Sequence, residues 1–405
     1  MRVLQIATST GGGAGIAARR LNAALNSIGV DSLLLSGASS KHPKNLDEVI
    51  AKKSFVTRNA SRIATVLQAK LVQKKNLLVT PFSLETISAK KVLKYAPDIV
   101  HLHTFFNLLS MRTISEICNS GIPIFITLHD ERFYTGGCHY SLNCSNYKKT
   151  CSNCPETSNM FHKQVERAQK NLYEALQKSP NVTVIAPSEW IGKNARESQI
   201  LNFAEVVKIN NPLSLEFIMK SESHRKIKEA SNPFLVTFVA QDLHSPFKGL
   251  DSIMKCISEY KTEFTDQNIK FMFVGAGPEI HIGALKAHQY ERIDSSRMVE
   301  IYTDTDLLIV PSLVDNSPNV IFEALVCGTP FVGSDQGGIP EIAKAFGMGT
   351  FVYGDSKSMY RAIIAQKSSE LDSNKIRDAA LAIVDPQVVA QKVAELYASK
   401  LTVAS

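Results

Sequence analysis

The sequence lacks any apolar run close to the roughly 20 residues that a membrane-spanning helix needs. Its first residues, MRVLQIATST, also lack the long apolar region and the cleavage site of a secretory signal peptide. An apolar content of 44% and a charged content of 20% are typical of globular chains. From these features we expect a soluble, cytoplasmic protein.

Acidic residues are missing from residues 49–84, where basic side chains alternate with apolar ones and carry part of the net charge of +7. A basic amphipathic helix of this kind can lie on an anionic membrane surface, which would place the protein on the inner face of the cytoplasmic membrane. It can equally pack its apolar stripe on its own domain. The sequence leaves both interpretations open. The segment lacks the aromatic platform on which bases stack, so we do not expect nucleic-acid binding.

A disulfide framework is not expected of seven cysteines in a cytoplasmic chain. Cys118, Cys256 and Cys327 lie singly among apolar residues, which predicts that they belong to the core. The remaining cysteines are clustered in the loop 129–155.

This loop reads HDERFYTGGCHYSLNCSNYKKTCSNCP and has no periodicity. A loop of this length is usually functional or held in place by other groups. Its four cysteines are Cys138, Cys144, Cys151 and Cys154. Four thiolates can hold a structural zinc ion in a tetrahedral site, although only one close C-x2-C pair is present. Structural zinc, acting as a staple and not as a catalyst, and free thiols remain alternatives.

An acid is also missing where a dinucleotide-binding protein needs one. The spacing Gly13-x-Gly15-x-x-Ala18 resembles a dinucleotide fingerprint, which requires an acidic residue at the end of the second strand to bind the ribose. The predicted second strand ends at 35 and is followed by Ser-Gly-Ala. A nucleotide-dependent oxidoreductase is therefore disfavoured.

The length of 405 residues suits two α/β domains of about 200 residues each. Buried strands alternate with amphipathic helices, and the motif Asn-Asn-Pro at 210–212 marks the expected hinge. We expect an N-terminal domain over 1–210, a C-terminal domain over 211–384 and a final helix within 385–405. The strands that we expect comprise 3–7, 32–35, 97–103, 124–128, 182–186, 206–209, 234–239, 271–274, 307–310 and 331–333.

The segment 307–341 reads LLIVPSLVDNSPNVIFEALVCGTPFVGSDQGGIPE and predicts a βαβ unit with a helix over 319–326. Ligands of open α/β sheets bind beyond the carboxyl ends of the strands, where the first helical turn offers free N–H groups. Asp315 and Glu323 frame the loop, and a carboxylate can accept hydrogen bonds from vicinal sugar hydroxyls. We therefore expect an anionic or hydroxyl-rich ligand here.

This pattern resembles the E-x7-E region of family 4 retaining glycosyltransferases that use nucleotide sugars, with Asp315 where that family usually has Glu. The resemblance implies a GT-B fold, an α/β architecture of two doubly wound Rossmann-like domains facing across a cleft. It implies transfer of a hexose from a UDP- or GDP-linked sugar to a glycan or lipid-linked acceptor. The motifs HD and TGGCHY and the spaced cysteines resemble the subgroup that makes bacterial surface polysaccharides, of the exopolysaccharide and colanic-acid type.

The resemblance also implies roles for single residues. Asp315 would contact the transferred hexose, Glu323 the nucleotide ribose and Lys248 the diphosphate. No metal is expected in catalysis, because a lysine and helix N-termini can neutralise the diphosphate. An arginine usual in the family upstream of the lysine is replaced here by Ala-Gln-Asp at 240–242. The implied donor-binding residues are Gly12, Gly13, Lys248, Asp315, Asn316, Ser317, Pro318, Asn319, Val320 and Glu323.

Histidines lie at the carboxyl ends of two of the predicted strands, at the edge where ligands of such sheets bind. His129 follows the strand 124–128, and the resemblance places it beside the donor sugar, which makes it catalytic together with Lys248 and Asp315. Asp130 is a candidate for acceptor binding, whereas we interpret His101 and His103 as structural. A non-catalytic nucleotide-sugar or carbohydrate-binding protein is the alternative, although such a protein would tolerate loss of these residues.

Overall fold

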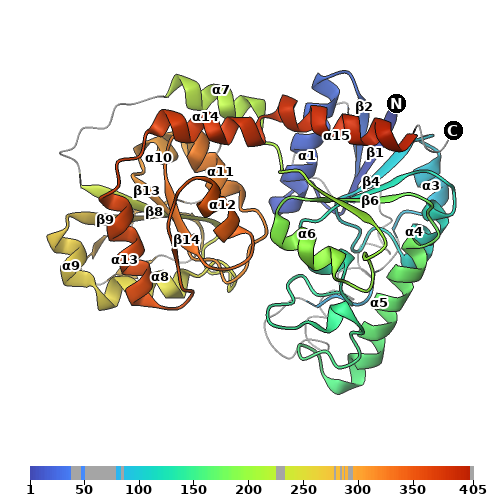
Figure 1. Cartoon of the computed structure of the whole chain (residues 1–405), viewed down its shortest axis with the longest axis horizontal. Coiled ribbons are helices and arrows are strands. Elements are labelled where there is room, and N and C mark those ends of the chain that lie inside the picture. The colour runs from blue at the N-terminus through green and yellow to red at the C-terminus, as the bar shows by residue number, and fades with distance from the viewer. Residues whose placement is uncertain are drawn as a thin grey trace. The chain divides into compact units, whose positions relative to one another are not determined.

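The computed structural model describes residues 1–37, 47–50, 79–83, 86–224, 233–277, 280–282, 285–286, 288–290 and 295–401. Most of the basic segment 49–84, for which we predicted an amphipathic helix, lies outside these residues. The chain divides into two compact units (Figure 1). Unit 1 comprises Met1–Pro212 with Val389–Ser405, and unit 2 comprises Leu213–Val388.

Unit 1 is built on a seven-stranded sheet in which neighbouring strands are parallel. Its elements are β1 (Arg2–Ala7), α1 (Gly12–Ser27), β2 (Asp31–Ser36), β3 (Glu48–Ile50), α3 (Ala89–Leu93), β4 (Ile99–Leu102), α4 (Met111–Cys118), β5 (Ile124–Thr127), the 3-10 helices η2 (Glu131–Phe133), η3 (Asn146–Lys148) and η4 (Asn159–Phe161), α5 (His162–Leu176), β6 (Val182–Ala186), α6 (Glu189–Arg196), β7 (Glu205–Lys208) and α15 (Pro386–Leu401). The strand order is β3-β2-β1-β4-β5-β6-β7. The order therefore reverses between β1 and β4.

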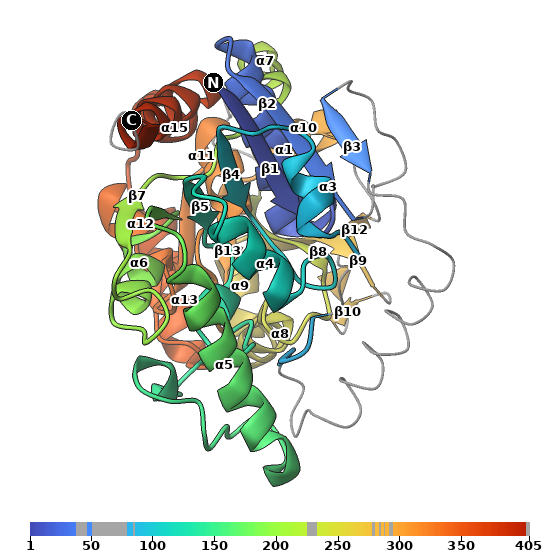
Figure 2. The same cartoon turned by 90° about the vertical axis from the view of Figure 1, so that its right-hand side faces the viewer.

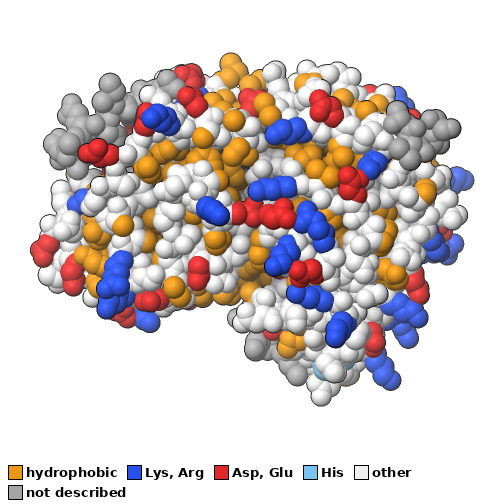
Figure 3. All heavy atoms as spheres, viewed as in Figure 1, with side chains coloured by type: hydrophobic (Ala, Val, Ile, Leu, Met, Phe, Trp, Pro, Cys, Tyr) orange, Lys and Arg blue, Asp and Glu red, His pale blue; other side chains and the backbone are white. Residues whose placement is uncertain are grey.

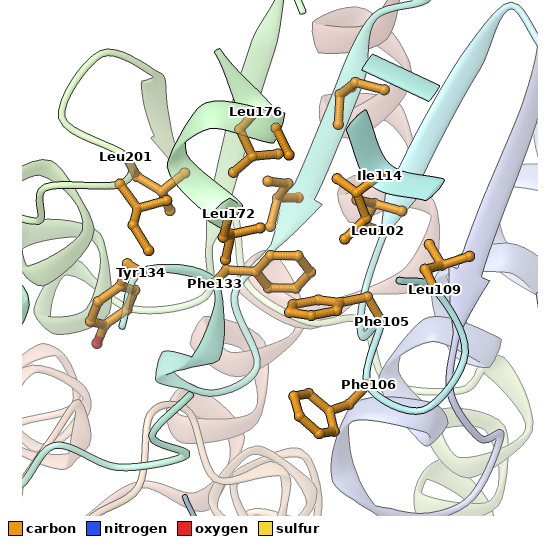
Figure 4. Close-up of a cluster of buried hydrophobic side chains, with 14 of the residues drawn as sticks. Leu102, Phe105, Phe106, Leu109, Ile114, Phe133, Tyr134, Leu172, Leu176 and Leu201 are labelled. Carbon is orange, nitrogen blue, oxygen red and sulfur yellow. The ribbon is translucent and has the colours of Figure 1, made fainter. Parts of the chain in front are cut away.

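Each face of this sheet has its own apolar core, because successive side chains of a strand point to opposite faces. Leu4 and Ile6 belong to the core that includes α4 and α5, whereas Val3, which precedes Leu4, packs with α1 and α15. Figure 2 shows α4 and α5 side by side against the sheet. Figure 4 shows aromatic rings at the centre of the first core, where the rings of Phe105 and Phe133 lie 4.9 Å apart.

The helix α15 packs along unit 1 beside α1 (Figure 1). Its Tyr397 is completely buried against Phe125 of β5, with the two rings at 4.7 Å in an edge-to-face arrangement. The Tyr397 hydroxyl lies 2.5 Å from Nδ1 of His101, which is also buried. Residues from the end of the described chain thus complete a core that the first strand begins.

Unit 2 is built on a six-stranded sheet, again with parallel neighbours, and a small antiparallel ribbon. Its elements are α7 (Leu215–Ser223), β8 (Phe234–Asp242), α8 (Leu250–Glu259), α9 (Lys261–Asp266), β9 (Ile269–Ala276), β10 (His281–Ile282), β11 (Leu285–Lys286), β12 (His288–Tyr290), α10 (Ser295–Asp304), β13 (Leu307–Val310), α11 (Asn319–Val326), β14 (Phe331–Ser334), α12 (Ile339–Ala345), β15 (Thr350–Phe351), α13 (Ser356–Lys367) and α14 (Ser373–Val384). The order β12-β9-β8-β13-β14-β15 reverses between β8 and β13.

Both units therefore have the doubly wound α/β architecture, and the predicted fold class is confirmed. The predicted strand at 307–310 and helix at 319–326 coincide with β13 and α11. β8 extends three residues beyond its predicted end at 239, because an irregular register lets Asp242 pair with Ala276.

No helix in the described part of the chain is long and apolar enough to cross a membrane. On the face drawn in Figure 3, basic and acidic side chains are interspersed, so this face has no uniformly basic patch.

Candidate active site

The sheet of unit 2 reverses its strand order between β8 and β13, and the loops that follow these two strands touch. The N–H of Leu313 donates to the carbonyl oxygen of Phe247 at 2.8 Å. Gly249 has a φ of 81°, and a Cβ atom there would lie only 1.9 Å from the carbonyl oxygen of Pro311. A glycine is needed at this position because it allows both the left-handed backbone and the close approach. The contact brings two predicted site loops together where open α/β sheets bind ligands.

Lys248 and Asp315 form an ion pair across this contact, with 2.6 Å between Nζ and Oδ2. The side chain of Asp315 is 13% exposed and that of Lys248 is 36% exposed, so the ammonium is within reach of a ligand. The structure thus brings together two predicted site residues that are 67 positions apart in sequence. A carboxylate that holds an ammonium in place makes a directed positive charge, which suits a phosphate ligand.

The turn after β14 holds the backbone of Asp315. The N–H of Gly338 donates to the carbonyl oxygen of Asp315 at 2.9 Å. A Cβ atom on Gly337, whose φ is 64°, would lie 2.1 Å from the same oxygen. The Gly-Gly pair at the end of the predicted motif therefore fixes the position of the acidic loop.

The same loop leads into the first turn of α11. Pro318 is the N-cap residue and supplies no side-chain hydrogen bond to the helix end. Asn316 is buried, whereas Ser317, Asn319 and Val320 are half-buried. The buried hydroxyl oxygen of Ser317 has no hydrogen-bond partner among the residues that the structure describes. An uncapped helix start beside such a hydroxyl can donate to phosphate or sugar oxygens.

Glu323 lies farther along α11 and contacts a residue that we did not predict. The hydroxyl group of Tyr302, on α10, donates to Oε2 of Glu323 at 3.1 Å. Tyr302 is completely buried, so its hydroxyl group is held firmly by the core. No sequence signal marks this tyrosine, because its role depends on how α10 packs beside α11.

In unit 1 the order reverses between β1 and β4, and a hydrogen bond joins the ends of these strands. The N–H of Thr8 donates to Oγ1 of Thr104 at 2.8 Å. The predicted glycine loop follows β1, and a Cβ atom on Gly15 would lie 2.3 Å from the carbonyl oxygen of Ser9. Gly12 has a φ of 72° and begins α1, and Gly13 is exposed. Both glycines therefore lie beyond the carboxyl end of β1, at the edge where open α/β sheets generally bind ligands.

His129 follows β5 at the same edge and is half-buried. Its Nε2 lies 3.0 Å from Nδ1 of His103, and the two ring planes are within 21° of parallel, with 5.3 Å between the ring centroids. Burial lowers the pKa of His129 to about 4, so the imidazole is neutral at pH 7. The structure brings His103, which we interpreted as structural, into direct contact with a predicted catalytic residue.

Asp130 is engaged by Arg132, a residue that the sequence analysis missed. The carboxylate of Asp130 accepts hydrogen bonds from Nε of Arg132 at 2.9 and 3.0 Å and also bonds to Nη2. Burial alone would raise the pKa of Asp130, but the charge of Arg132 and its hydrogen bonds lower it to about 2. The guanidinium also lies over the ring of Phe106, 5.3 Å from its centroid. The sequence signal that could have revealed Arg132 is its position in the motif His-Asp-Glu-Arg at 129–132.

The four clustered cysteines have reduced thiols, with Cys138, Cys151 and Cys154 buried and Cys144 half-buried. Within the described ranges, no group of three or more His, Cys, Asp or Glu side chains has an arrangement that could hold a metal ion. The four thiols therefore form no ready-made metal site in this conformation. Structural zinc stays a prediction that metal analysis must test.

Comparison with known proteins identifies part of the chain. Residues 233–366, which include Lys248, Asp315 and Glu323, match the protein family described as Glycosyl transferases group 1. This part of the chain is therefore a glycosyl transferases group 1 domain.

Two curated proteins are similar to the chain. A protein of Escherichia coli (strain K12), named as the colanic acid biosynthesis glycosyl transferase WcaC, is 21% identical over 264 residues. That match covers 62% of this chain and 63% of the relative, which is less than two thirds of its length. N-acetyl-alpha-D-glucosaminyl L-malate synthase of Bacillus anthracis is 26% identical over 107 residues, which cover 25% of this chain and 28% of that protein.

Solved structures show the same fold over the whole chain. Sucrose-phosphate synthase from Thermosynechococcus elongatus has a TM-score of 0.63 at 15% identity and covers 100% of both chains. HepE from Anabaena, solved in complex with UDP, has a TM-score of 0.60 at 14% identity, with 98% of this chain and 100% of that chain covered. Identities this low show that the fold is shared and nothing more.

Proposed function

We propose that this chain, whose residues 233–366 form a glycosyl transferases group 1 domain, moves a hexose from a UDP- or GDP-linked sugar to a glycan or lipid-linked acceptor. The observation that carries the proposal is the Lys248–Asp315 ion pair at the reversal point of the unit 2 sheet. The name of the Escherichia coli relative supports a role in surface polysaccharide synthesis, and the UDP complex of HepE supports a nucleotide sugar as donor.

The proposed chemistry uses the charge of Lys248 when the nucleoside diphosphate leaves. Negative charge then develops on the diphosphate, and a positioned ammonium together with the N–H groups of the first turn of α11 would stabilise it without a metal ion. Asp315 uses Oδ2 to hold the lysine, so its other carboxylate oxygen can accept a hydrogen bond from a hexose hydroxyl. One acid would thus orient both the cation and the sugar.

We propose retention of the anomeric configuration by attack on the face from which the diphosphate leaves. In this scheme the bond between the anomeric carbon and the phosphate oxygen breaks, and the acceptor oxygen forms its bond to the same carbon. The leaving phosphate takes the acceptor proton, so that no enzymic nucleophile is required. Glu323, with Oε2 held by Tyr302, would bind the nucleotide ribose through its carboxylate.

A screen of nucleotide sugars for protection against thermal unfolding tests donor binding. A ligand at 100 times its dissociation constant stabilises a protein by about 2.7 kcal/mol. Release of nucleoside diphosphate with candidate acceptors then tests transfer, and proton NMR of the product reports its anomeric configuration. If no UDP- or GDP-sugar protects the protein and none is turned over, the proposal is wrong. Protection without transfer to any acceptor would favour the non-catalytic binding protein.

An oxidoreductase finds no support in unit 1, since β2 ends at Ser36 without the acid that binds a ribose.

Attachment to the inner membrane face through residues 49–84 is a separate part of the proposal. It predicts sedimentation with vesicles that contain anionic lipid, but not with neutral vesicles, and loss of sedimentation at high salt. Sedimentation that does not depend on lipid charge would contradict it.

A further inference from the structure

We propose that Gln5 and His103 fix the tautomer of His129, so that Nδ1 of His129 accepts a hydrogen bond from a hydroxyl group of the sugar substrate. The identity of the substrate rests on the proposed function, whereas the tautomer follows from the protein alone. Gln5 and His103 act here as positioning residues. A line of hydrogen bonds runs from β1, past the end of β4, to the end of β5.

The line begins at the side-chain amide of Gln5, which is completely buried in β1. Its Nε2 donates to Oγ of Ser32 at 2.8 Å and to Oδ1 of Asn22 at 3.2 Å. The Ser32 hydroxyl group donates its own hydrogen to Oδ1 of Asn22 at 2.8 Å, so toward Gln5 the Ser32 oxygen can only accept. An amide nitrogen can only donate, so Nε2 of Gln5 must face the oxygens of Ser32 and Asn22. The amide oxygen of Gln5 therefore points away from these two residues.

The oxygen of Gln5 determines which nitrogen of His103 carries hydrogen. Nε2 of His103 lies 2.7 Å from Oε1 of Gln5, and because this oxygen only accepts, Nε2 must be the donor. His103 is 1% exposed, and burial lowers its pKa well below 6.5, so the ring is neutral and has a single N–H group. Nδ1 of His103 is consequently an acceptor.

His129 must then donate through Nε2, which lies 3.0 Å from Nδ1 of His103. Burial keeps the pKa of His129 at about 4, and the nearby charges of Asp130 and Arg132 act in opposite directions on it. A neutral ring with hydrogen on Nε2 has a lone pair on Nδ1. Within the described residues the ring makes no other hydrogen bond, so Nδ1 is left for a ligand or water.

This polarity restricts the group that can bind at His129. A hydroxyl group can donate to the Nδ1 lone pair, whereas the oxygens of a carboxylate or phosphate would be repelled by it. We therefore expect the sugar to have a hydroxyl group on the carbon nearest to His129. The carboxylate of a uronic acid is excluded from that position.

Long-range proton–nitrogen NMR correlations of ¹⁵N-labelled full chain test the tautomer without any ligand. We expect the Nε2–H form of neutral His129 at pH 7, with its signals assigned by their loss in His129→Gln. The Nδ1–H form, or a protonated ring at pH 7, would overturn the proposal. The tautomer is read from the unmodified protein, so this result does not depend on whether Gln5→Glu folds.

Gln5→Glu tests the positioning role. A carboxylate stabilises protonated His103, both of whose nitrogens then donate, so His129 must accept through Nε2 and move its hydrogen to Nδ1. We expect this reversal, together with at least a tenfold loss of turnover in the folded variant. The matched control is Gln169→Glu, since Gln169 is equally buried in unit 1 but bonds to Tyr147 and Cys151. The control should leave the tautomer of His129 unchanged, and an unchanged tautomer in folded Gln5→Glu would refute the positioning role.

Addition of a nucleotide sugar separates this inference from the proposed function. We expect an upfield shift of the Nδ1 nitrogen signal of His129, as a hydroxyl group donates to it. Turnover without this shift would refute the hydroxyl contact and leave the proposed function intact. Absence of binding by any nucleotide sugar would instead refute the proposed function, while the ligand-free spectrum would still decide the tautomer.

Discussion

Lys248 carries the positive charge of the candidate donor site, and its removal makes the most direct test at the scale of single residues. Lys248→Ala should weaken binding of the nucleotide sugar at least tenfold, about 1.4 kcal/mol, because the diphosphate loses its cation. Asp315, which is 13% exposed, would keep enough contact with water for the fold to survive. Calorimetric titration measures the affinity, and circular dichroism checks the fold.

The matched control is Lys255→Ala, because Lys255 is paired with Glu259 on the exposed side of α8. This variant should bind the nucleotide sugar as the unmodified protein does.

Glu323→Gln keeps an acceptor for Tyr302 but loses the charge that would face the ribose, and it should also weaken binding about tenfold. Unchanged donor binding and turnover in both site variants would show that the site lies elsewhere.

His129→Ala should lower turnover by roughly 100-fold, which is within the range for a positioned polar group. Binding of the nucleoside diphosphate should change little, because Lys248 and Glu323, which we propose contact the diphosphate and the ribose, belong to unit 2. A paired measurement of rate and diphosphate affinity makes the test. If affinity falls as far as rate does, or if the rate is unaltered, His129 has a structural role only.

Residues of the candidate site differ in how well the sequence predicts them. Asp315 and Glu323 stand in a local motif, and the structure places them on the loop and helix that the motif predicts. Gln5 and Tyr302 carry no local signal, because each acts through partners far away in sequence. Arg132 could have been found, since a cation two residues after a candidate acid is a natural ion-pair partner.

At the scale of elements, the loop contact at Gly249 positions the end of β8 relative to β13. Gly249→Ala should destabilise unit 2 and weaken donor binding, because a Cβ atom would lie 1.9 Å from the carbonyl oxygen of Pro311 and push Lys248 away. Gly354→Ala is the control, since its φ of 79° matches the 81° of Gly249 but its Cβ would meet nothing within 4 Å. Gly354→Ala should lower the free energy of unfolding by only the roughly 1 kcal/mol that an alanine costs in the left-handed backbone conformation.

Chemical denaturation and calorimetric titration measure the two effects of Gly249→Ala. Equal stability losses in the two glycine variants, with donor binding intact in both, would show that the close approach does not matter.

The cysteine loop is the second element that can be tested. If the four thiols hold zinc, protein prepared without chelators should contain about one equivalent, and Cys151→Ser should release it and loosen the loop. Atomic absorption and limited proteolysis measure these effects. Because the described side chains form no metal-ready group, binding would require the loop to rearrange. A metal-free preparation would leave four ordinary thiols.

Elements with continuous apolar runs are the ones that sequence predicts well. β4, β5 and β13 are buried along their whole length, and their Val, Ile, Leu and Phe residues predict parallel strands covered on both faces. β3 and the β10–β11 ribbon are short and lack that pattern. The end of β8 was missed because its last residues are polar and exposed.

At the scale of the whole molecule, acid should destabilise unit 1. Burial lowers the pKa of His101 to about 3, that of His103 well below 6.5, and those of His129 and His139 to about 4. The unfolded chain therefore binds more protons between about pH 4 and 6.5, and stability falls as the pH falls. Each histidine contributes about 1.4 kcal/mol per pH unit in this window. Glu131, whose pKa burial raises to about 7, acts in the opposite direction and offsets part of the loss.

Trp190 reports this effect, because it is the one tryptophan of the chain and lies on α6 in unit 1. The urea midpoint measured by its fluorescence should fall from pH 7 to pH 5. His139→Gln removes one of the four groups and should make the fall less steep. A midpoint that does not depend on pH would contradict the buried, neutral state of these histidines.

The return of α15 to unit 1 has a consequence for the order in which the protein is made. Val389, Val393 and Tyr397 pack with the first strand and helix, yet the ribosome makes all of Leu213–Val388 before it reaches them. Domains made during translation generally fold from the N-terminal side, but this core is incomplete until α15 emerges. Unit 2 can therefore fold on the ribosome while unit 1 still exposes apolar surface, which would make the nascent chain a client for chaperones until α15 has emerged.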